Sequence, residues 1–415
     1  MKPEIKQRIQ QIGRGEVPER YVKTALGLAP ANWKRYTFGD IYTERKEPGD
    51  ENLPLLMVSI HSGVSDGEVD AAELPKQVKR IEDKSQYKKA VSGDLVFNMM
   101  RAWQGAIGIV RTTGMVSPAY IVAKPNDKVY PLFMDYYSRT PQMINQIDRQ
   151  SYGVTDFRKR LYWDSFAPIG CILPPIEEQQ KIAAILTTQD KVIELKEKRL
   201  AEKQRQKKYL MQQLLTGKKR LPGFSGAWKA DLLGKLFLER KETNCEGLQM
   251  LAITGTQGII PRKELDLKDN SSEDKSKYLR VCVGDIGYNT MRMWQGVSAY
   301  SNYEGIVSPA YTILKPSSSI NAKYFAYLFK TPEIIFLFYR FSQGLVDDTR
   351  NLKYENFKKI KVFYPPDIEE QTAIAEVLSA ADREIELLQQ DIEQEKQKKK
   401  ALMQLLLTGI VRVKI

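Results

Sequence analysis

Short apolar runs alternate along this chain with longer stretches in which apolar residues follow helical spacing. Four runs predict buried strands: LLMVSI (55–60), AYIVA (119–123), MLAITG (250–255) and AYTIL (310–314). Residues 131–147 and 322–338 predict helices, each interrupted by a Thr/Pro pair. The pattern therefore predicts mixed α and β structure in both halves of the chain.

Two stretches of about 40 residues predict long helices. Each follows a double proline and begins with two glutamates, where the helix dipole favours negative charge. We expect the helices to end at Gly217 and Gly409. Apolar side chains recur at heptad spacing and predict a coiled-coil seam, formed by Leu186, Ile193, Leu200, Leu214, Leu378, Ile385, Ile392 and Leu406. The alternative interpretation is that each helix lies on its own globular domain.

The two halves of the chain repeat one another. Residues 91–125 return at 282–316 with a constant spacing of 191, and residues 177–217 return at 369–409 with a spacing of 192. Repeats of this length indicate a duplicated protein rather than a solenoid of short period. Copies related by a pseudo-two-fold axis would place the long helices antiparallel. Such a duplicated chain suits a partner that offers two similar sites.

These patterns predict an α+β fold, in which two pseudo-symmetric mixed α/β domains are separated by two long helices packed as an antiparallel coiled coil. Ile5, Ile9 and Ile12 predict a helix in an N-terminal arm, which we expect to end at Pro18. The predicted segments are the arm (1–30), the first domain (31–171), the first long helix (172–220), the second domain (221–362) and the second long helix (363–415).

Composition favours a nucleic-acid partner. The net charge is +13, from 64 Lys and Arg against 51 Asp and Glu, which suits a polyanion, although a merely soluble basic protein is an alternative. Cys171, Cys245 and Cys282 lack metal or redox spacing and fit a reducing compartment. The sequence shows no signal-peptide pattern and no run of 18 apolar residues. We therefore expect a cytoplasmic protein that does not contact membranes.

Catalytic motifs are missing from the sequence. His61 is the only histidine, so a duplicated histidine site is excluded. There is no phosphate-binding loop and no glycine-rich nucleotide fingerprint, and the double prolines lack the flanking residues of the adenine methyltransferase motif. Residues 82–84 and 273–275 match half of a nuclease signature, but a solvated loop is the preferred interpretation. We expect no catalytic residue, no metal site and no cofactor in this chain.

Eight polar side chains are candidates for DNA contact. Arg-x-Trp-Gln-Gly occurs at 101–105 and again at 292–296, and arginine can read guanine as glutamine reads adenine. Glycine loops at 151–160 and 342–351 differ between the copies, so they could read different sequences. The candidates are Arg101, Gln104, Arg158, Lys159, Arg160, Arg292, Gln295 and Arg350. Alternatively, Trp103 and Trp294 are core residues and the arginines form structural ion pairs.

The order of the motifs is specific and covers nearly the whole chain. A globular segment leads to PPIEEQQKIAAIL…LLTG, then RLPGFSGAWK, a second globular segment and PPDIEEQTAIAEVL…LLLTG. This order resembles the specificity subunits of type I restriction–modification systems. In that family each globular domain is a target recognition domain that reads one half of a bipartite DNA site. The paired helices set the spacer and dock two modification subunits.

The resemblance also implies where catalysis takes place. The modification subunits bind S-adenosylmethionine and methylate adenine N6, and two restriction subunits that use ATP with Mg²⁺ can join them. This chain would supply sequence-specific recognition of double-stranded DNA and assembly, without catalysis of its own. Two other function classes remain open at this point: a self-contained DNA methyltransferase or nuclease, and a DNA-binding regulator or coiled-coil organiser. The N-terminal arm lies outside the repeat and could pack where the second long helix ends.

Overall fold

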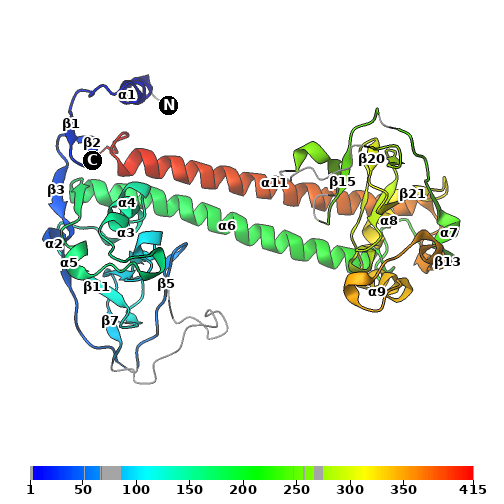
Figure 1. Cartoon of the computed structure of the whole chain (residues 1–415), viewed down its shortest axis with the longest axis horizontal. Coiled ribbons are helices and arrows are strands. Elements are labelled where there is room, and N and C mark those ends of the chain that lie inside the picture. Colours follow the sequence, from blue (N-terminus) through cyan, green and yellow to red (C-terminus); the bar gives the residue numbers. More distant parts are fainter. Residues whose placement is uncertain are drawn as a thin grey trace. The chain divides into compact units, whose positions relative to one another are not determined.

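The structure is a computed structural model. It describes residues 3–50, 52–65, 67, 86–245, 247–255, 258–265 and 274–414. Residues 82–84, half of the nuclease-like match, lie outside this described part, as does Glu273. The chain divides into two compact units, which are Met1–Leu195 with Ile392–Ile415, and Lys196–Asp391. Both units combine helices with antiparallel sheets (Figure 1). The predicted fold class is therefore confirmed.

Unit 1 begins with the arm and contains the first domain. Its elements are α1 (Pro3–Gly13), β1 (Tyr21–Thr24), β2 (Gly27–Pro30), β3 (Lys34–Thr37), α2 (Phe38–Ile41), β4 (Tyr42–Glu44), β5 (Val58–Ser59), β6 (Gly63–Val64), β7 (Lys88–Ala90), β8 (Leu95–Asn98), η2 (Ala102–Gln104), β9 (Ile107–Ile109), β10 (Gly114–Val116), β11 (Tyr120–Pro125), α3 (Pro131–Tyr137), α4 (Pro141–Arg149), η3 (Asp156–Arg158), α5 (Trp163–Phe166) and β12 (Gly170–Leu173). Helix α6 (Ile176–Leu214) follows and continues into unit 2.

Unit 2 repeats the domain. Its elements are β13 (Lys229–Leu232), α7 (Leu233–Leu236), β14 (Phe237–Glu239), β15 (Leu251–Ile253), β16 (Ile259–Pro261), η4 (Arg262–Glu264), β17 (Leu279–Val281), β18 (Ile286–Asn289), η5 (Met293–Gln295), β19 (Ser298–Tyr300), β20 (Gly305–Val307), β21 (Tyr311–Pro316), α8 (Ala322–Leu328), α9 (Pro332–Phe341), η6 (Asp347–Thr349), α10 (Tyr354–Phe357) and β22 (Lys361–Tyr364). Helix α11 (Ile368–Leu407) begins in this unit and ends in unit 1.

A four-stranded antiparallel sheet forms the centre of each domain. The strand order is β4-β11-β8-β9 in unit 1 and β14-β21-β18-β19 in unit 2. The register is also the same, because Tyr120 lies opposite Asn98 and Tyr311 lies opposite Asn289. Strands β3 and β12 pair where the chain enters and leaves the first domain, as β13 and β22 do in the second. The sequence repeat is therefore a repeat of topology.

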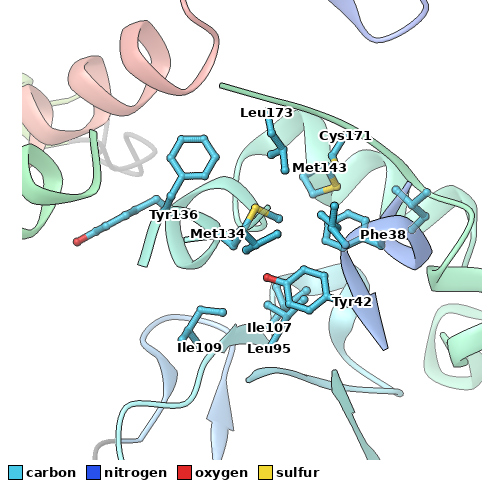
Figure 2. Packing of buried hydrophobic residues seen from close by; sticks show 14 of the residues in the cluster. Phe38, Tyr42, Leu95, Ile107, Ile109, Met134, Tyr136, Met143, Cys171 and Leu173 are labelled. Atoms are coloured by element: carbon cyan, nitrogen blue, oxygen red, sulfur yellow. The ribbon is translucent and has the colours of Figure 1, made fainter. Parts of the chain in front are cut away.

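The main core of unit 1 gathers side chains from the sheet and the helices beside it. Phe38, Leu95, Ile107, Met134 and Cys171 are buried and lie close together in Figure 2. Burying such a side chain contributes about 1.5–3 kcal/mol to folding as an upper estimate. Burial also raises the pKa of the Cys171 thiol to about 12. This cysteine is therefore a protonated packing residue in the domain core.

A buried ion pair explains why Glu-Arg-Lys-Glu occurs in both copies. The Arg45 Nε donates to an Asp94 oxygen over 2.7 Å, and Arg240 donates to Asp285 over the same 2.7 Å. Each aspartate also accepts a backbone N–H from the turn before β8 or β18. The charge-assisted bonds therefore tie the edge strand, β4 or β14, to that turn.

Within unit 1, the segments of α6 and α11 run antiparallel. Glu178 at the start of α6 pairs with Arg412 beyond the end of α11, over 2.6 Å, and Asp190 pairs with Lys399 over 2.5 Å further along. Four seam residues in this unit are buried: Leu186, Ile193, Ile392 and Leu406. Leu186 and Leu406 also belong to the domain core. The helix segments therefore pack on the domain and on each other, which combines the two sequence interpretations.

The helix segments of unit 2 are antiparallel as well. Lys196 pairs with Asp391 and Lys203 with Glu384, each over 2.9 Å, so rising numbers on α6 meet falling numbers on α11. Of the seam residues in this unit, two are buried and two are half-buried; these are Leu214 and Leu378, and then Leu200 and Ile385.

A tyrosine hydrogen bond fastens each domain to its helix. The Tyr136 hydroxyl donates to Asp190 over 2.7 Å, and the Tyr327 hydroxyl donates to Asp382 over 2.6 Å. Two heptad positions of the seam hold lysines instead of apolar residues: Lys207, between Leu200 and Leu214, and Lys399, between Ile392 and Leu406. The same two aspartates pair with these lysines, Asp190 with Lys399 and Asp382 with Lys207. The lysines at these seam positions therefore complete a polar contact that recurs in both copies.

The two glutamates that begin each long helix have different roles. Glu178, the second glutamate of α6, is buried and accepts the Arg412 guanidinium and the Trp33 indole N–H. Glu370 is buried in the same way and accepts Arg220 over 2.6 Å. The predicted dipole effect therefore explains only part of the motif. The second acid of each pair is an ion-pair partner that the pattern alone did not reveal.

The N-terminal arm lies against the end of α11. The Tyr21 hydroxyl donates to the Gly409 carbonyl over 2.7 Å, and Arg8 donates to the Ile410 carbonyl over 3.1 Å. A Cβ on Gly409 would lie 2.5 Å from the Pro30 ring, so glycine permits this close approach. The arm therefore packs within unit 1 rather than standing apart as a separate domain.

The predicted end of the first helix was wrong, whereas the predicted glycines do follow the ends of both long helices. Helix α1 ends at Gly13, well before Pro18, because the chain turns there through Gly15 with φ +79°. The long helices end at Leu214 and Leu407, and the predicted glycines follow in the next turn with φ of +72° and +71°.

Two predicted strands are shorter than their apolar runs. The run 55–60 contributes only Val58–Ser59 to a strand, because its partner β6 is equally short and Leu55 pairs separately with Met115. The run 250–255 contributes Leu251–Ile253, which pairs with β16.

Within the described ranges, no helix combines the length and apolar character needed to cross a membrane. The same ranges contain no group of three or more His, Cys, Asp or Glu side chains that could hold a metal ion.

Candidate nucleic-acid interface

Each domain presents an Arg-x-Trp-Gln-Gly turn after the third strand of its sheet order. A short 3₁₀ turn, η2 or η5, follows β8 or β18 and ends at a glycine in the left-handed region, with φ of +103° at Gly105 and +80° at Gly296. The Trp103 indole N–H donates to the Met100 carbonyl over 3.0 Å, and Trp294 donates to Met291 over 2.9 Å. The turns therefore have the same local geometry in both copies.

The arginines and glutamines of these turns point their polar groups at solvent. Arg101, Gln104, Arg292 and Gln295 are all exposed. In the part of the chain that is described, none of their side chains makes a hydrogen bond or an ion pair. The turn backbone is fixed, since the N–H of Arg101 donates to the Asn98 carbonyl over 3.1 Å. A rigid turn thus carries donors that are free to bind an external acceptor.

The two tryptophans have a packing role. Trp103 is half-buried against the domain core. Trp294 packs edge-to-face on Tyr339, with ring centroids 6.2 Å apart. These contacts favour the interpretation that the tryptophans pack the turns onto the domain, while the flanking arginine and glutamine are exposed to solvent.

A glycine loop, residues 151–160 or 342–351, adjoins each turn. Paired backbone hydrogen bonds join the two ends of the loop, and we call this pairing its neck. Tyr152 and Arg160 exchange two backbone hydrogen bonds of 2.9 and 2.8 Å, and Gln343 and Asn351 exchange two of 2.8 Å. A Cβ on Gly153 would lie 2.5 Å from backbone atoms across the neck, so only glycine fits there. The base of each loop is joined to the turn by a backbone hydrogen bond, from Leu161 to Met99 and from Leu352 to Thr290.

A cation at the same repeat position holds each loop in place, but the two cations contact different kinds of partner. Lys159 pairs with Asp148 over 2.7 Å and with Asp156 over 3.0 Å, and its ammonium lies 4.8 Å from the Trp103 ring centre. These carboxylates raise the pKa of Lys159. The fastening in the first copy is therefore mainly an ion pair.

In the second copy the equivalent cation contacts an aromatic ring. Arg350, which is 191 residues after Lys159, pairs with Asp347 over 2.8 Å. Its guanidinium lies 4.0 Å from the ring centre of Tyr339, the counterpart of Asp148, and donates to the Tyr339 hydroxyl. Both cations are half-buried. They hold the loops in place, which reduces their freedom to contact DNA.

The eight candidates therefore fall into two groups. Five are exposed and lack a side-chain partner among the described residues; these are Arg101, Gln104, Arg158, Arg292 and Gln295. The other three are half-buried and have internal contacts; these are Lys159, Arg160 and Arg350. The turns are common to both domains, whereas the exposed cation Arg158 belongs to the first loop alone.

Lys330 supports the second turn, although its sequence context gave no sign of this role. Its ammonium donates to the Gly296 carbonyl over 2.7 Å, and burial together with the nearby Lys207 charge lowers the pKa of Lys330 to about 8. The equivalent residue of the first copy, Arg139, pairs with Asp135 instead. No spacing pattern could reveal a contact that depends on how α8 approaches the turn.

Comparison with known proteins decides the family. A family model for the type I restriction modification DNA specificity domain matches residues 75–204 and again residues 267–397, more than half of the chain. The chain belongs to this family. The two matches confirm the internal repeat that the sequence predicted.

Related proteins agree with this assignment. The type I restriction enzyme MjaVIII specificity subunit of Methanocaldococcus jannaschii is 23% identical, over 95% of this chain and 97% of its own length. The type I restriction–modification S subunit of M. genitalium has a similar fold, with a TM-score of 0.54 at 13% identity, covering 90% of this chain and 96% of that one. A further chain, from a study of complex assembly and conformational transition of the type I R-M system, gives a TM-score of 0.52 at 17% identity, covering 92% and 99% of the two chains.

Family membership defines the role of the chain in coarse terms. It is a type I specificity subunit, the component that recognises a DNA sequence and is not itself an enzyme. DNA and the methyltransferase and restriction subunits are the partners that this role implies. The absence of catalytic motifs from the sequence agrees with a recognition component.

Arg101→Ala and Arg292→Ala are expected to distinguish base reading from phosphate contact. If each arginine reads a guanine, discrimination at one base pair falls by about 1–3 kcal/mol, and the salt dependence of binding changes little. If each holds a phosphate, affinity falls evenly across sequences and the salt slope drops by roughly one. Binding titrations at several salt concentrations measure both. A lowered melting temperature would instead show that the arginines are structural.

Proposed function

We propose that each domain of this specificity subunit reads one half of a bipartite, asymmetric DNA site. The observation that carries the proposal is the repeated turn, which presents Arg101 and Gln104 in one domain and Arg292 and Gln295 in the other, all exposed and without internal partners among the described residues. The adjoining loops differ in sequence, so the halves read by the two domains differ. The resulting site has two unlike parts.

The paired helices are proposed to set the distance between the half-sites and to dock two adenine-N6 methyltransferase subunits. Antiparallel pairing in each unit, through Lys399 with Asp190 and through Lys207 with Asp382, supports a fixed helix register. Leu195 and Leu387 occupy equivalent helix positions and are 65% and 64% exposed. An exposed leucine repeated at one helix position favours two equivalent copies of one partner.

Cofactors are proposed to belong to the partner subunits. The methyltransferase subunits bind S-adenosylmethionine, and ATP with Mg²⁺ is needed where two restriction subunits join. The lack of a phosphate-binding loop and of a nucleotide fingerprint in the sequence supports this division. The purified chain alone is accordingly expected to methylate no DNA.

Replacing residues 31–171 by a copy of residues 226–362 is expected to make the recognised site symmetric, because both positions would then hold the same reader. Sequencing of N6-methyladenine in the host measures the site, with the unaltered gene and a deletion strain as controls. Loss of a split motif in the deletion strain ties methylation to this chain. An asymmetric motif that survives the replacement would contradict the assignment of one reader to each half-site.

A further inference from the structure

Each glycine loop carries a branched aliphatic side chain at its tip. Val154 is 93% exposed and Leu345 is 99% exposed. They are 191 residues apart and therefore occupy the same position in the two copies. The neighbouring positions have changed character, from Thr155 in one loop to Val346 in the other, whereas the tip is aliphatic in both.

The tip side chains contribute almost nothing to the fold. A side chain that is 99% exposed buries no apolar surface, so its hydrophobicity does not stabilise the chain. Loop tips usually carry polar or turn-forming residues instead. An aliphatic tip that recurs in both domains is therefore explained better by an external surface than by packing.

Both tips project from rigid necks. The neck of the first loop is closed by paired backbone hydrogen bonds between Tyr152 and Arg160, and the neck of the second loop by those between Gln343 and Asn351. A cation also holds each loop in place: Lys159 lies over Trp103 of the turn in the first copy, and Arg350 lies over Tyr339 of α9 in the second. Each loop is therefore already ordered in the folded chain. Binding then loses little further conformational entropy in the loop.

The charge around the tips favours DNA as the occupant. In the first loop Lys159 pairs with both Asp148 and Asp156, while the exposed Arg158 beside the tip and the exposed Arg101 on the adjoining turn have no side-chain partner among the described residues. In the second loop Asp347 is paired with Arg350, the sequence adds a second aspartate, Asp348, and the exposed Arg292 lies on the adjoining turn. An unpaired guanidinium on the turn beside each loop, with a further one beside the first tip, suits a polyanion that also offers apolar groups.

The dimensions and chemistry of a duplex narrow the contact further. A neck two strands wide spans about 5 Å between its backbones, which suits the major groove of about 12 Å better than the minor groove of about 6 Å. In the major groove the apolar group on a base edge is the C5 methyl of thymine. An aliphatic tip therefore has one chemically matched target there.

We propose that Val154 and Leu345 are specificity-determining residues, each of which contacts a thymine methyl group in the major groove of its half-site. This inference rests on the proposed function, because it assumes that each domain reads one half-site. It adds an apolar contact to the polar reading by Arg101, Gln104, Arg292 and Gln295.

The test uses the full chain, purified with its methyltransferase subunits, and duplexes that contain the methylated site. Replacing each thymine in turn by deoxyuridine removes only the methyl group. We expect one such replacement in one half-site to weaken wild-type binding about tenfold. Leu345→Ser should weaken binding to the thymine duplex by a similar factor, and the same deoxyuridine should then have no further effect. Val154→Ser should behave likewise in the other half-site.

Conservative variants and stability provide the controls. Leu345→Met and Val154→Ile keep an apolar tip and should retain binding and sensitivity to the methyl group. Both serine variants should melt at the wild-type temperature, because the replaced side chains are exposed. The inference is overturned if the serine variants bind like wild type, if their effects and that of deoxyuridine simply add, or if a half-site contains no thymine. A wild-type complex without sequence preference would instead refute the proposed function itself.

Discussion

Replacing Asp285 by alanine is expected to destabilise unit 2 by about 3–5 kcal/mol, because the Arg240 guanidinium loses its buried partner and keeps only the more exposed Glu242. The Asp285 side chain is 2% exposed, and it also accepts the backbone N–H of Cys282 over 2.8 Å, which would lose its acceptor as well. Chemical denaturation of the purified chain, followed by a probe in the second domain, measures the loss. Asp94→Ala should have the same effect on unit 1.

Glu242→Ala is the matched control for this prediction. Glu242 pairs with the same Arg240, but its side chain is 47% exposed, so its removal should cost less than about 1 kcal/mol. A small and equal loss for Asp285→Ala and Glu242→Ala would show that the buried pair does not hold the edge strand in place.

Lengthening both long helices by four residues is expected to lengthen the spacer of the recognised site by one base pair. The insertions belong between two ion pairs, Lys196 with Asp391 and Lys203 with Glu384, so that the pairs on either side are retained. Four residues add about 6 Å of rise and a net rotation of about 40°. One base pair needs about 3.4 Å and roughly 35° of twist. The rotation matches well, and a tilted helix projects less of the rise along the DNA.

A matched insertion of seven residues serves as the contrasting variant. It keeps the heptad seam and adds about 10 Å, near three base pairs, but it returns the rotation to within about 20° of its start. Three base pairs need more than about 100°, so this variant should lose methylation although its helices pair well. Sequencing of methylated sites measures both variants. Full activity of the four-residue variant at the original spacer would show that the helices do not set the distance.

The fold could largely be predicted because its main signals are periodic. The heptad spacing and the register between the copies depend only on the order of residues. They predicted two helices of about 40 residues, and α6 and α11 have 39 and 40 residues. Local boundaries were less accurate. The run 55–60 is apolar throughout, but only Val58–Ser59 finds a strand partner. Strand length depends on the neighbouring strand, which the run itself does not encode.

The candidate site was predictable only in part, for a similar physical reason. Arg101 and Arg158 were selected by residue type, and they have no partner among the described residues. Lys159 was selected on the same grounds, but it is paired with Asp148. Whether a cation is free or paired depends on side chains that the fold brings together, so charge in a sequence does not distinguish a binding residue from a fastening residue.

The two loop fastenings also indicate how this protein can diversify after duplication. In one copy Lys159 pairs with Asp148, and in the other Arg350 stacks on Tyr339. Either single-step intermediate keeps an attraction, because aspartate pairs with lysine or arginine and tyrosine attracts either cation. Evolution can therefore pass from one fastening to the other without an unfastened ancestor. One loop can therefore change its contacts by single mutations while the contacts of the other loop stay as they were.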